Sequence, residues 1–212
     1  MQNFYLIRWL RENSGMDPDI LDSLKYELDK RIYYYGGQFA CPAERSPFQA
    51  KFSGARRALA ETALSLKRAG AGTPGANSGV RISSNAYFNF NSALSEQGFN
   101  VFNAPWSVAR AELMDSGLHR RVRRVRAVLD NADFKELLTG EFASELRRLK
   151  TELKEYYRRA DIAALVVPSD MPVFERLAIK IFKESGKPSF ISLHGLPARY
   201  NSADENRTDY LL

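Results

Sequence analysis

His194 and Gly195 are the residues of this sequence whose types and position bear most directly on chemistry. His194 is one of two histidines, and it follows a run at residues 188–193 that predicts a strand. An imidazole at a strand end could accept a proton from a hydroxyl or donate to a phosphate. Gly195 would let the backbone turn and a ligand approach. We predict that His194 is a general base; a loop histidine bonded to a backbone carbonyl is the alternative.

Other polar residues follow predicted strands, where ligands bind in parallel α/β sheets. Ser84 and Asn85 end a strand at residues 80–84, and Asp170 follows a strand at residues 162–167. We expect Asp170 mainly to cap the next helix, and turn formation is the alternative role for Ser84 and Asn85. The candidate substrate-binding residues are Ser84, Asn85, Asp170, Gly195 and Arg199.

A dense basic cluster lies in the middle of the chain. On a helix, Val122, Val125 and Leu129 would form its buried stripe and the arginines would cover its exposed face. Such a face is either simply solvated or contacts phosphates or anionic lipid headgroups. Each basic residue near an anionic lipid surface contributes about 1 kcal/mol of binding free energy. The sequence has no recognised nucleic-acid module, so we expect no nucleic-acid partner. The candidate anion- or membrane-binding residues are Arg120, Arg121, Arg123 and Arg124.

Composition narrows the classes of function. The chain has 212 residues and a formal charge of +6, which favours anionic partners in general. Its single cysteine, Cys41, cannot form an internal disulfide, which favours a reducing, cytoplasmic setting. No apolar run approaches the roughly 18–20 residues needed to span a bilayer, so we expect at most peripheral contact with the inner face of a membrane. The sequence lacks paired metal-ligand spacings, a P-loop and G-x-S-x-G, and we expect neither a metal nor a cofactor.

The chain divides into three regions. Residues 1–69 read as helical, residues 70–79 as a glycine-rich linker, and residues 80–212 as an α/β domain. The linker contains a literal G-x-G-x-x-G. We reject it as a dinucleotide fingerprint, because that motif needs a preceding strand and a following helix, whereas here a helix precedes and a strand follows.

The alternation of elements after residue 79 predicts the fold. The strand at 162–167, the helix at 171–185 and the strand at 189–193 form a βαβ unit, which is parallel and right-handed in nearly all proteins. In the helix before that unit, we expect Leu146, Leu149, Leu153 and Tyr156 to be buried, and in the helix after Asp17 we expect a leucine stripe of Leu21, Leu24 and Leu28 on one face. We predict a Rossmann-like three-layer α/β sandwich with a mainly parallel sheet, preceded by an α-helical N-terminal region. The other predicted strands are 80–84, 99–103 and 210–212; the other predicted helices are one from Asp17 to Gly36, then 53–69, 87–97, 107–118, 119–129, 131–138 and 141–159.

The segment from Ala160 to Asp170, the helix up to Gly186 and the segment from Lys187 to Tyr200 resemble the N-terminal half of GT-B glycosyltransferase-like proteins. The similarity is to bacterial surface-polysaccharide enzymes and polyol-phosphate transferases, in which an inter-domain strand ends in a His-Gly turn. The last residues, 207–212, look like the strand that leads toward a C-terminal donor-binding domain. Leu193 stands where the polyol-phosphate transferases have an aromatic residue, so the resemblance does not extend to polyol-phosphate transfer in particular.

This resemblance implies an acceptor-side domain of a transferase in cell-surface polysaccharide biosynthesis. A glycan or lipid-linked acceptor would bind this half, and a nucleotide-activated sugar donor would bind mainly a C-terminal domain after Leu212. The family's proposed catalytic base matches His194 alone. Two alternatives remain open: a non-catalytic binding or scaffold module of the same fold, and a sugar-nucleotide enzyme of the 2-epimerase type. We expect this half by itself to be inactive.

Overall fold

A single parallel sheet organises the protein. The computed structural model describes residues 3–33, 79–86, 88–107, 115–192 and 209–211. Within these residues five strands pair in the order β2-β1-β3-β4-β5, all parallel. Their bounds are β1 Arg81–Ser84, β2 Asn100–Asn103, β3 Ala164–Val167, β4 Ser189–Ile191 and β5 Tyr210–Leu211. The predicted α/β class with a parallel sheet is confirmed.

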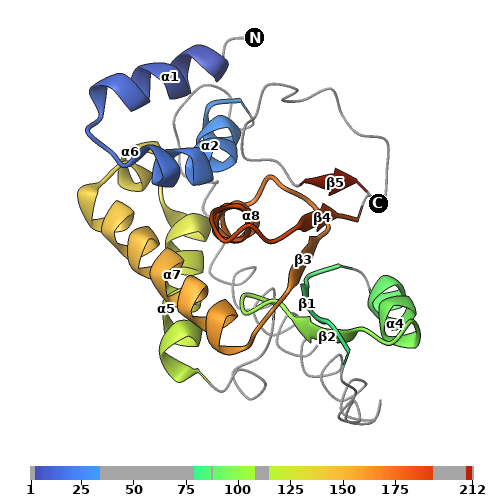
Figure 1. The fold of residues 1–212 in the computed structure, drawn as a ribbon. Helices are drawn as coiled ribbons and strands as arrows, with labels where there is room; N and C mark the ends of the chain where they lie inside the picture. Colours follow the sequence, from blue (N-terminus) through green and yellow to red (C-terminus); the bar gives the residue numbers. More distant parts are fainter. Residues whose placement is uncertain (1–2, 34–78, 87, 108–114, 193–208, 212) are drawn as a thin grey trace, which may run out of the picture.

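Helices lie on both sides of this sheet (Figure 1). α4 stands on one side, and α5, α7 and α8 stand on the other, beneath α1 and α2 (Figure 1). The order 2-1-3-4-5 is one of the two common orders of doubly wound sheets, in which the connections on either side of β1 run in opposite directions. The helix bounds are α1 Asn3–Asn13, α2 Pro18–Tyr33, α4 Phe88–Glu96, α5 Ser116–Asn131, α6 Phe134–Leu137, α7 Gly140–Arg159 and α8 Val173–Glu184.

The central strand β3 is apolar at every position because both of its faces are buried. Leu165 and Val167 pack into the larger core, which also contains residues of α5, α7 and α8. Ala164 and Val166 point the other way, into a smaller cluster with Leu94 of α4. Successive strand residues face opposite sides, so one short apolar run serves both cores.

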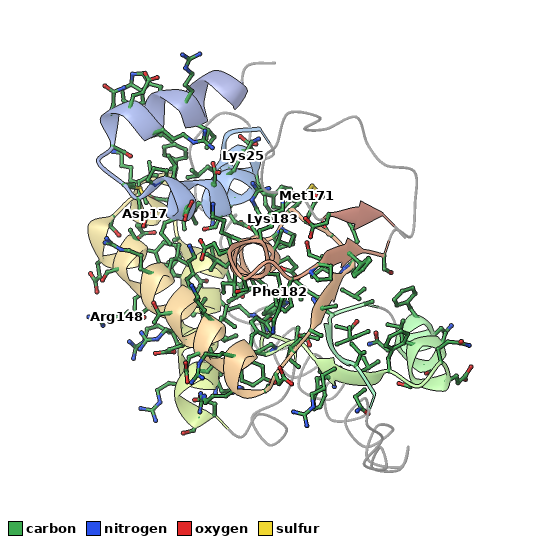
Figure 2. The ribbon with its side chains drawn as sticks, in the orientation of Figure 1. Asp17, Lys25, Arg148, Met171, Phe182 and Lys183 are labelled. Atoms are coloured by element: carbon green, nitrogen blue, oxygen red, sulfur yellow. The ribbon has the colours of Figure 1, made fainter. Side chains whose placement is uncertain are left out.

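The βαβ unit predicted at residues 162–193 is confirmed over its described part. β3 and β4 are parallel, with Leu165 opposite Ser189, and α8 connects them. Gly186 ends the connection with φ +64°, a conformation that glycine adopts without strain. Phe182 of α8 meets the Tyr157 ring of α7 edge-on, with centroids 4.9 Å apart at 75° (Figure 2).

The N-terminal helices share the main core. Ile20, Leu21, Leu24 and Leu28 of α2 are completely buried, as the predicted leucine stripe requires. They belong to the same cluster as the buried residues of α5, α7 and α8. The linker at residues 70–79 and the helix at 53–69 lie almost wholly outside the described residues, so the division into domains stays a prediction.

Two details of the predicted helices are wrong. Asp170 does not cap α8: the N-cap is Pro172, which makes no side-chain cap bond. A residue before proline avoids the helical conformation, so the helix cannot begin at Met171. In α7 the buried stripe ends in Tyr157, which is 3% exposed, while Tyr156 is only partly buried.

The predicted break between helices at residues 118 and 119 is also wrong. α5 is continuous because nothing at that point interrupts a helix, and its start is set by Asp115, whose side chain accepts from the Leu118 N–H at 2.9 Å. The predicted helix at 131–138 is shorter, and it begins with a capping box between Asp133 and Glu136. Residues 108–114 lie outside the described part of the chain.

Arg31 ties the N-terminal helices to the rest of the fold. Its side chain is 1% exposed. Its guanidinium donates to the Ala132 carbonyl at 2.9 Å and the Leu129 carbonyl at 2.7 Å, both at the end of α5. It also donates to the Glu27 carboxylate at 2.8 Å and the Glu27 carbonyl at 2.9 Å. A buried charge is tolerated here because it has an ion partner and its donors have acceptors.

We predict that Arg31→Met lowers the free energy of unfolding by about 3–5 kcal/mol, because it leaves the Glu27 carboxylate and two carbonyls of α5 without their donor. Arg8→Met is the matched control: Arg8 lies on α1, 69% exposed, and its change should stay within about 0.5 kcal/mol. Urea denaturation of the full chain followed by circular dichroism measures both. Equal stability of the two variants would contradict the role of Arg31.

Candidate functional site

The strand order opens a crevice at the carboxyl edge of the sheet. β1 lies between β2 and β3, and the helices that follow β1 and β3 lie on opposite faces of the sheet (Figure 1), so the two chain segments diverge where these strands end. Asn85 directly follows β1, and its N–H donates to the Val166 carbonyl of β3 at 3.0 Å. This bond fixes Asn85 at the point where ligands of doubly wound sheets bind.

A pocket of about 810 Å³ opens beside Asn85. Its walls come from α2, from the segment after β2, from α5 and from the start of α8. We call it the carboxyl-edge pocket. It is lined by Glu27, Lys30, Asn85, Trp106, Ser107, His119, Val122, Arg123, Arg126, Ala127, Leu129, Asp130, Pro172, Val173, Phe174 and Glu175.

Glu175 is the buried polar centre of this pocket. It lies in the first turn of α8 and is 6% exposed. Its Oε1 accepts from the Asn85 side-chain amide at 2.9 Å and from the Trp106 indole N–H at 3.1 Å. One carboxyl oxygen therefore joins the ends of β1 and β2 to the start of α8.

Arg126 and two aromatic rings form the wall next to Glu175. The Trp106 and Phe174 rings stack with centroids 6.1 Å apart at 12°. The Arg126 guanidinium lies 5.5 Å from the Phe174 ring centroid and donates to the Trp106 carbonyl. These contacts hold the segment after β2 against α5 and α8.

Burial raises the pKa of the Glu175 carboxyl above its ordinary value. Hydrogen bonds from its own N–H, from Trp106 and from Asn85 oppose the shift, as does the positive charge of Arg126. Since burial outweighs them, the folded protein holds the Glu175 proton more tightly than the unfolded chain does. A carboxyl of this kind can donate as well as accept hydrogen bonds.

The predicted substrate-binding residues have different places in the structure. Asn85 lines the carboxyl-edge pocket. Ser84 is completely buried, and its hydroxyl bonds to the Asn91 side chain at 2.6 Å and accepts from the Ala86 N–H at 3.1 Å. Asp170 is 8% exposed and, like Ser84, is not among the residues that line the pocket. His194, Gly195 and Arg199 lie outside the described residues, so their roles stay predictions.

The predicted basic face is only partly a solvated face. Arg120, Arg123 and Arg124 are exposed, and Val122 and Val125 are buried as predicted. Arg121 instead turns toward α7, where it bonds to Glu145 at 2.8 Å and Glu152 at 2.7 Å. Burial alone would lower the pKa of Arg121, but these two carboxylates raise it above its usual value.

The sequence analysis missed the residues that build the pocket: Glu175, Trp106 and Arg126. A carboxylate three residues after Pro172, within an otherwise apolar helix face, is the one signal that could have pointed to Glu175. A glutamate in the first turn of a helix is also common for dipole reasons, so the signal is weak. Nothing in the sequence marks Trp106 or Arg126 as its neighbours.

Comparison with family models, with curated proteins and with solved structures gave no match. Among the described helices none is both long and apolar enough to cross a membrane. The described residues also contain no group of three or more histidine, cysteine, aspartate or glutamate side chains that could hold a metal ion.

We predict that Glu175→Gln changes how stability depends on pH. Because the folded pKa of Glu175 is raised, the wild-type chain loses stability relative to Glu175→Gln as pH rises above about 4.3, the ordinary glutamate value. Glutamine keeps an oxygen to accept from Asn85 and Trp106. Urea titrations of both proteins between pH 4 and pH 8 measure the difference.

Asp19→Asn is the control, because the pKa of Asp19 is shifted in the direction opposite to that of Glu175. Burial raises the pKa of Asp19, but hydrogen bonds from Lys150 and Lys180 outweigh it and hold that pKa below its ordinary value. The wild-type chain should therefore gain stability relative to Asp19→Asn as pH rises toward about 3.9 and stay level above it, so urea titrations of this pair extend down to about pH 2. The same trend in both variants would contradict the raised pKa of Glu175.

Proposed function

We propose that this chain is the acceptor-side domain of a GT-B-type glycosyltransferase of bacterial surface-polysaccharide biosynthesis, and that it binds the acceptor glycan in the carboxyl-edge pocket. The observation that carries the proposal is the cluster of Asn85, Trp106 and Glu175 at the crevice between β1 and β3. Crevices at this place in doubly wound sheets are where ligands bind.

The chemistry of the pocket suits a hydroxyl-rich ligand. A sugar hydroxyl both donates and accepts hydrogen bonds; the side-chain amide of Asn85 does the same, and the Glu175 carboxyl supplies acceptor oxygens. Phe174 and Trp106 supply an apolar floor, while Lys30 and Arg123 supply donors at the sides. A pocket that combines a few fixed polar groups with aromatic walls is typical of small-molecule sites.

In this proposal the reaction needs groups beyond the described residues. His194 acts as the base that removes the proton from the acceptor hydroxyl. Gly195 and Arg199 are proposed to contact the acceptor as well. The nucleotide-activated sugar donor binds mainly to a C-terminal domain. The setting is cytoplasmic, with peripheral contact at the inner face of the membrane where lipid-linked acceptors are held.

Binding at the pocket can be followed at a single atom. The chain has two tryptophans, and the indole N–H of Trp106 bonds to Glu175 while Trp9 is 58% exposed on α1. We predict that methyl glycosides of common bacterial sugars shift the Trp106 indole signal in a ¹⁵N–¹H correlation spectrum and leave that of Trp9 unchanged. Asn85→Ala should weaken this binding about tenfold, the loss expected for one or two hydrogen bonds.

Ser95→Ala is the matched control, because Ser95 is an exposed residue of α4 that lies outside the pocket. It should leave glycoside affinity unchanged. Shifts of equal size at Trp9 and Trp106 would indicate non-specific binding and contradict the carbohydrate site, and so would the absence of any shift at Trp106 with the whole panel.

Catalysis needs a separate test in the full-length protein. His194→Ala should abolish sugar transfer while donor binding and the Trp106 response to glycosides persist. Transfer assays with radiolabelled nucleotide sugar measure the first, and the correlation spectrum measures the second. Unchanged turnover in that variant would end the general-base role. Glycoside binding without any transfer in the unmodified protein would identify a binding module of the same fold.

A further inference from the structure

A second hollow lies on α5 beside the carboxyl-edge pocket. It is about 540 Å³ in volume and is lined by Ser116, His119, Arg120, Arg123 and Arg124. We call it the arginine groove. Its lining residues are spaced three and four apart along one helix, so their side chains lie next to one another on one face.

The helix that carries the arginine groove, α5, is fixed to the rest of the protein by its buried face and by Arg121. Leu118, Val122 and Val125, on the opposite face of α5, are each at most 4% exposed and belong to the main core. Arg121 fixes α5 to α7 through its two bonds with Glu145 and Glu152. The backbone that carries the groove arginines is therefore held in place without any ligand.

The charge of the groove is only partly neutralised. Neither Arg120 nor Arg123 forms an ion pair within the described part of the chain. Arg124 lies 3.5 Å from a Glu145 oxygen, but this carboxylate also bonds to Arg121 and contacts Arg148 at 3.7 Å, so it is shared among three cations. Among the described residues, therefore, the groove keeps a net positive charge.

The nearest acid at the start of the helix does not cancel that charge. Asp115 accepts from the Leu118 N–H and pairs with Arg159 at 2.8 Å. Its pKa is lowered, first by the Leu118 hydrogen bond and then by Arg159, so it is ionised but already paired. Asp130, the exposed acid within α5, lines the carboxyl-edge pocket and is not among the residues that line the arginine groove.

The two hollows adjoin each other on α5. His119 and Arg123 line both the arginine groove and the carboxyl-edge pocket. A ligand of moderate size can therefore place one end among the arginines and the other beside Asn85 and Glu175. Guanidinium groups bind phosphate with paired, charge-assisted hydrogen bonds, which makes an anionic end the one that fits the groove.

We propose that the arginine groove binds the phosphate group of a small phosphorylated ligand, and that the uncharged part of this ligand reaches into the carboxyl-edge pocket. The second half rests on the proposed carbohydrate site, whereas the first half does not. The ligand class is a sugar phosphate or the diphosphate end of a lipid-linked sugar, which share the same anionic group.

The test compares two double variants of the full chain. Arg120→Gln with Arg123→Gln removes two charges from the groove, and Arg8→Gln with Arg147→Gln removes two from exposed positions on α1 and α7. Glutamine is nearly as good a helix former as arginine. Calorimetric titration with inorganic pyrophosphate and with glucose 1-phosphate should show binding about tenfold or more weaker for the groove variant and about unchanged for the control.

Three other outcomes of such binding measurements would overturn part or all of the proposal. Equal weakening in both variants would show attraction by net charge alone and would overturn the groove. Arginine-dependent binding to vesicles containing phosphatidylglycerol, with no affinity for either soluble phosphate, would assign the arginines to a membrane surface and overturn the small-ligand site. Arginine-dependent pyrophosphate binding without any Trp106 response to glycosides would keep the groove and overturn only the carbohydrate pocket.

Discussion

The buried guanidinium of Arg31 is the interaction on which the arrangement of the site depends. It donates to two carbonyls at the end of α5, which lie about a hundred positions away along the chain. It also donates to the Glu27 carboxylate of its own helix. α2 and α5 both line the carboxyl-edge pocket, so this contact fixes two of its walls relative to each other. Apolar packing alone is less directional, whereas a forked donor with fixed acceptors sets both distance and orientation.

Glu175 links separate elements at the carboxyl edge of the sheet, as Arg31 links α2 to α5. The segments that follow β1 and β2 are already held by backbone bonds to neighbouring strands, and Glu175 adds a common side-chain acceptor. One carboxyl oxygen receives Asn85 from the first and Trp106 from the second. The burial that raises the pKa of Glu175 also makes these bonds strong, because little water competes for them. The same group is therefore a structural link and the polar centre of the proposed glycan site.

The α5 helix shows how one amphipathic pattern separates into several roles. Val122 and Val125 are buried, and this stripe could be read from spacing alone. The five arginines after His119 behave differently from one another. Arg121 forms an ion pair with Glu145 of α7, and Arg126 packs on Phe174. Arg120, Arg123 and Arg124 stay at the surface, where they line the arginine groove. A helical period decides which side of the helix a residue lies on, but the neighbouring elements decide which charges are paired.

The sequence by itself determined the α/β class, the parallel βαβ unit, the leucine stripe of α2 and the place of Asn85 at a strand end, because these depend on local periodicity and on the geometry of parallel sheets. It also favoured Asp170 as a helix cap, which the proline at position 172 rules out. The pocket itself was decided only in three dimensions. Glu175 meets Asn85 across 90 positions and Trp106 across 69, and Arg121 meets Glu152 across 31. Contacts of this range leave no spacing signal in the chain, since they arise only when the sheet order brings the strand ends together.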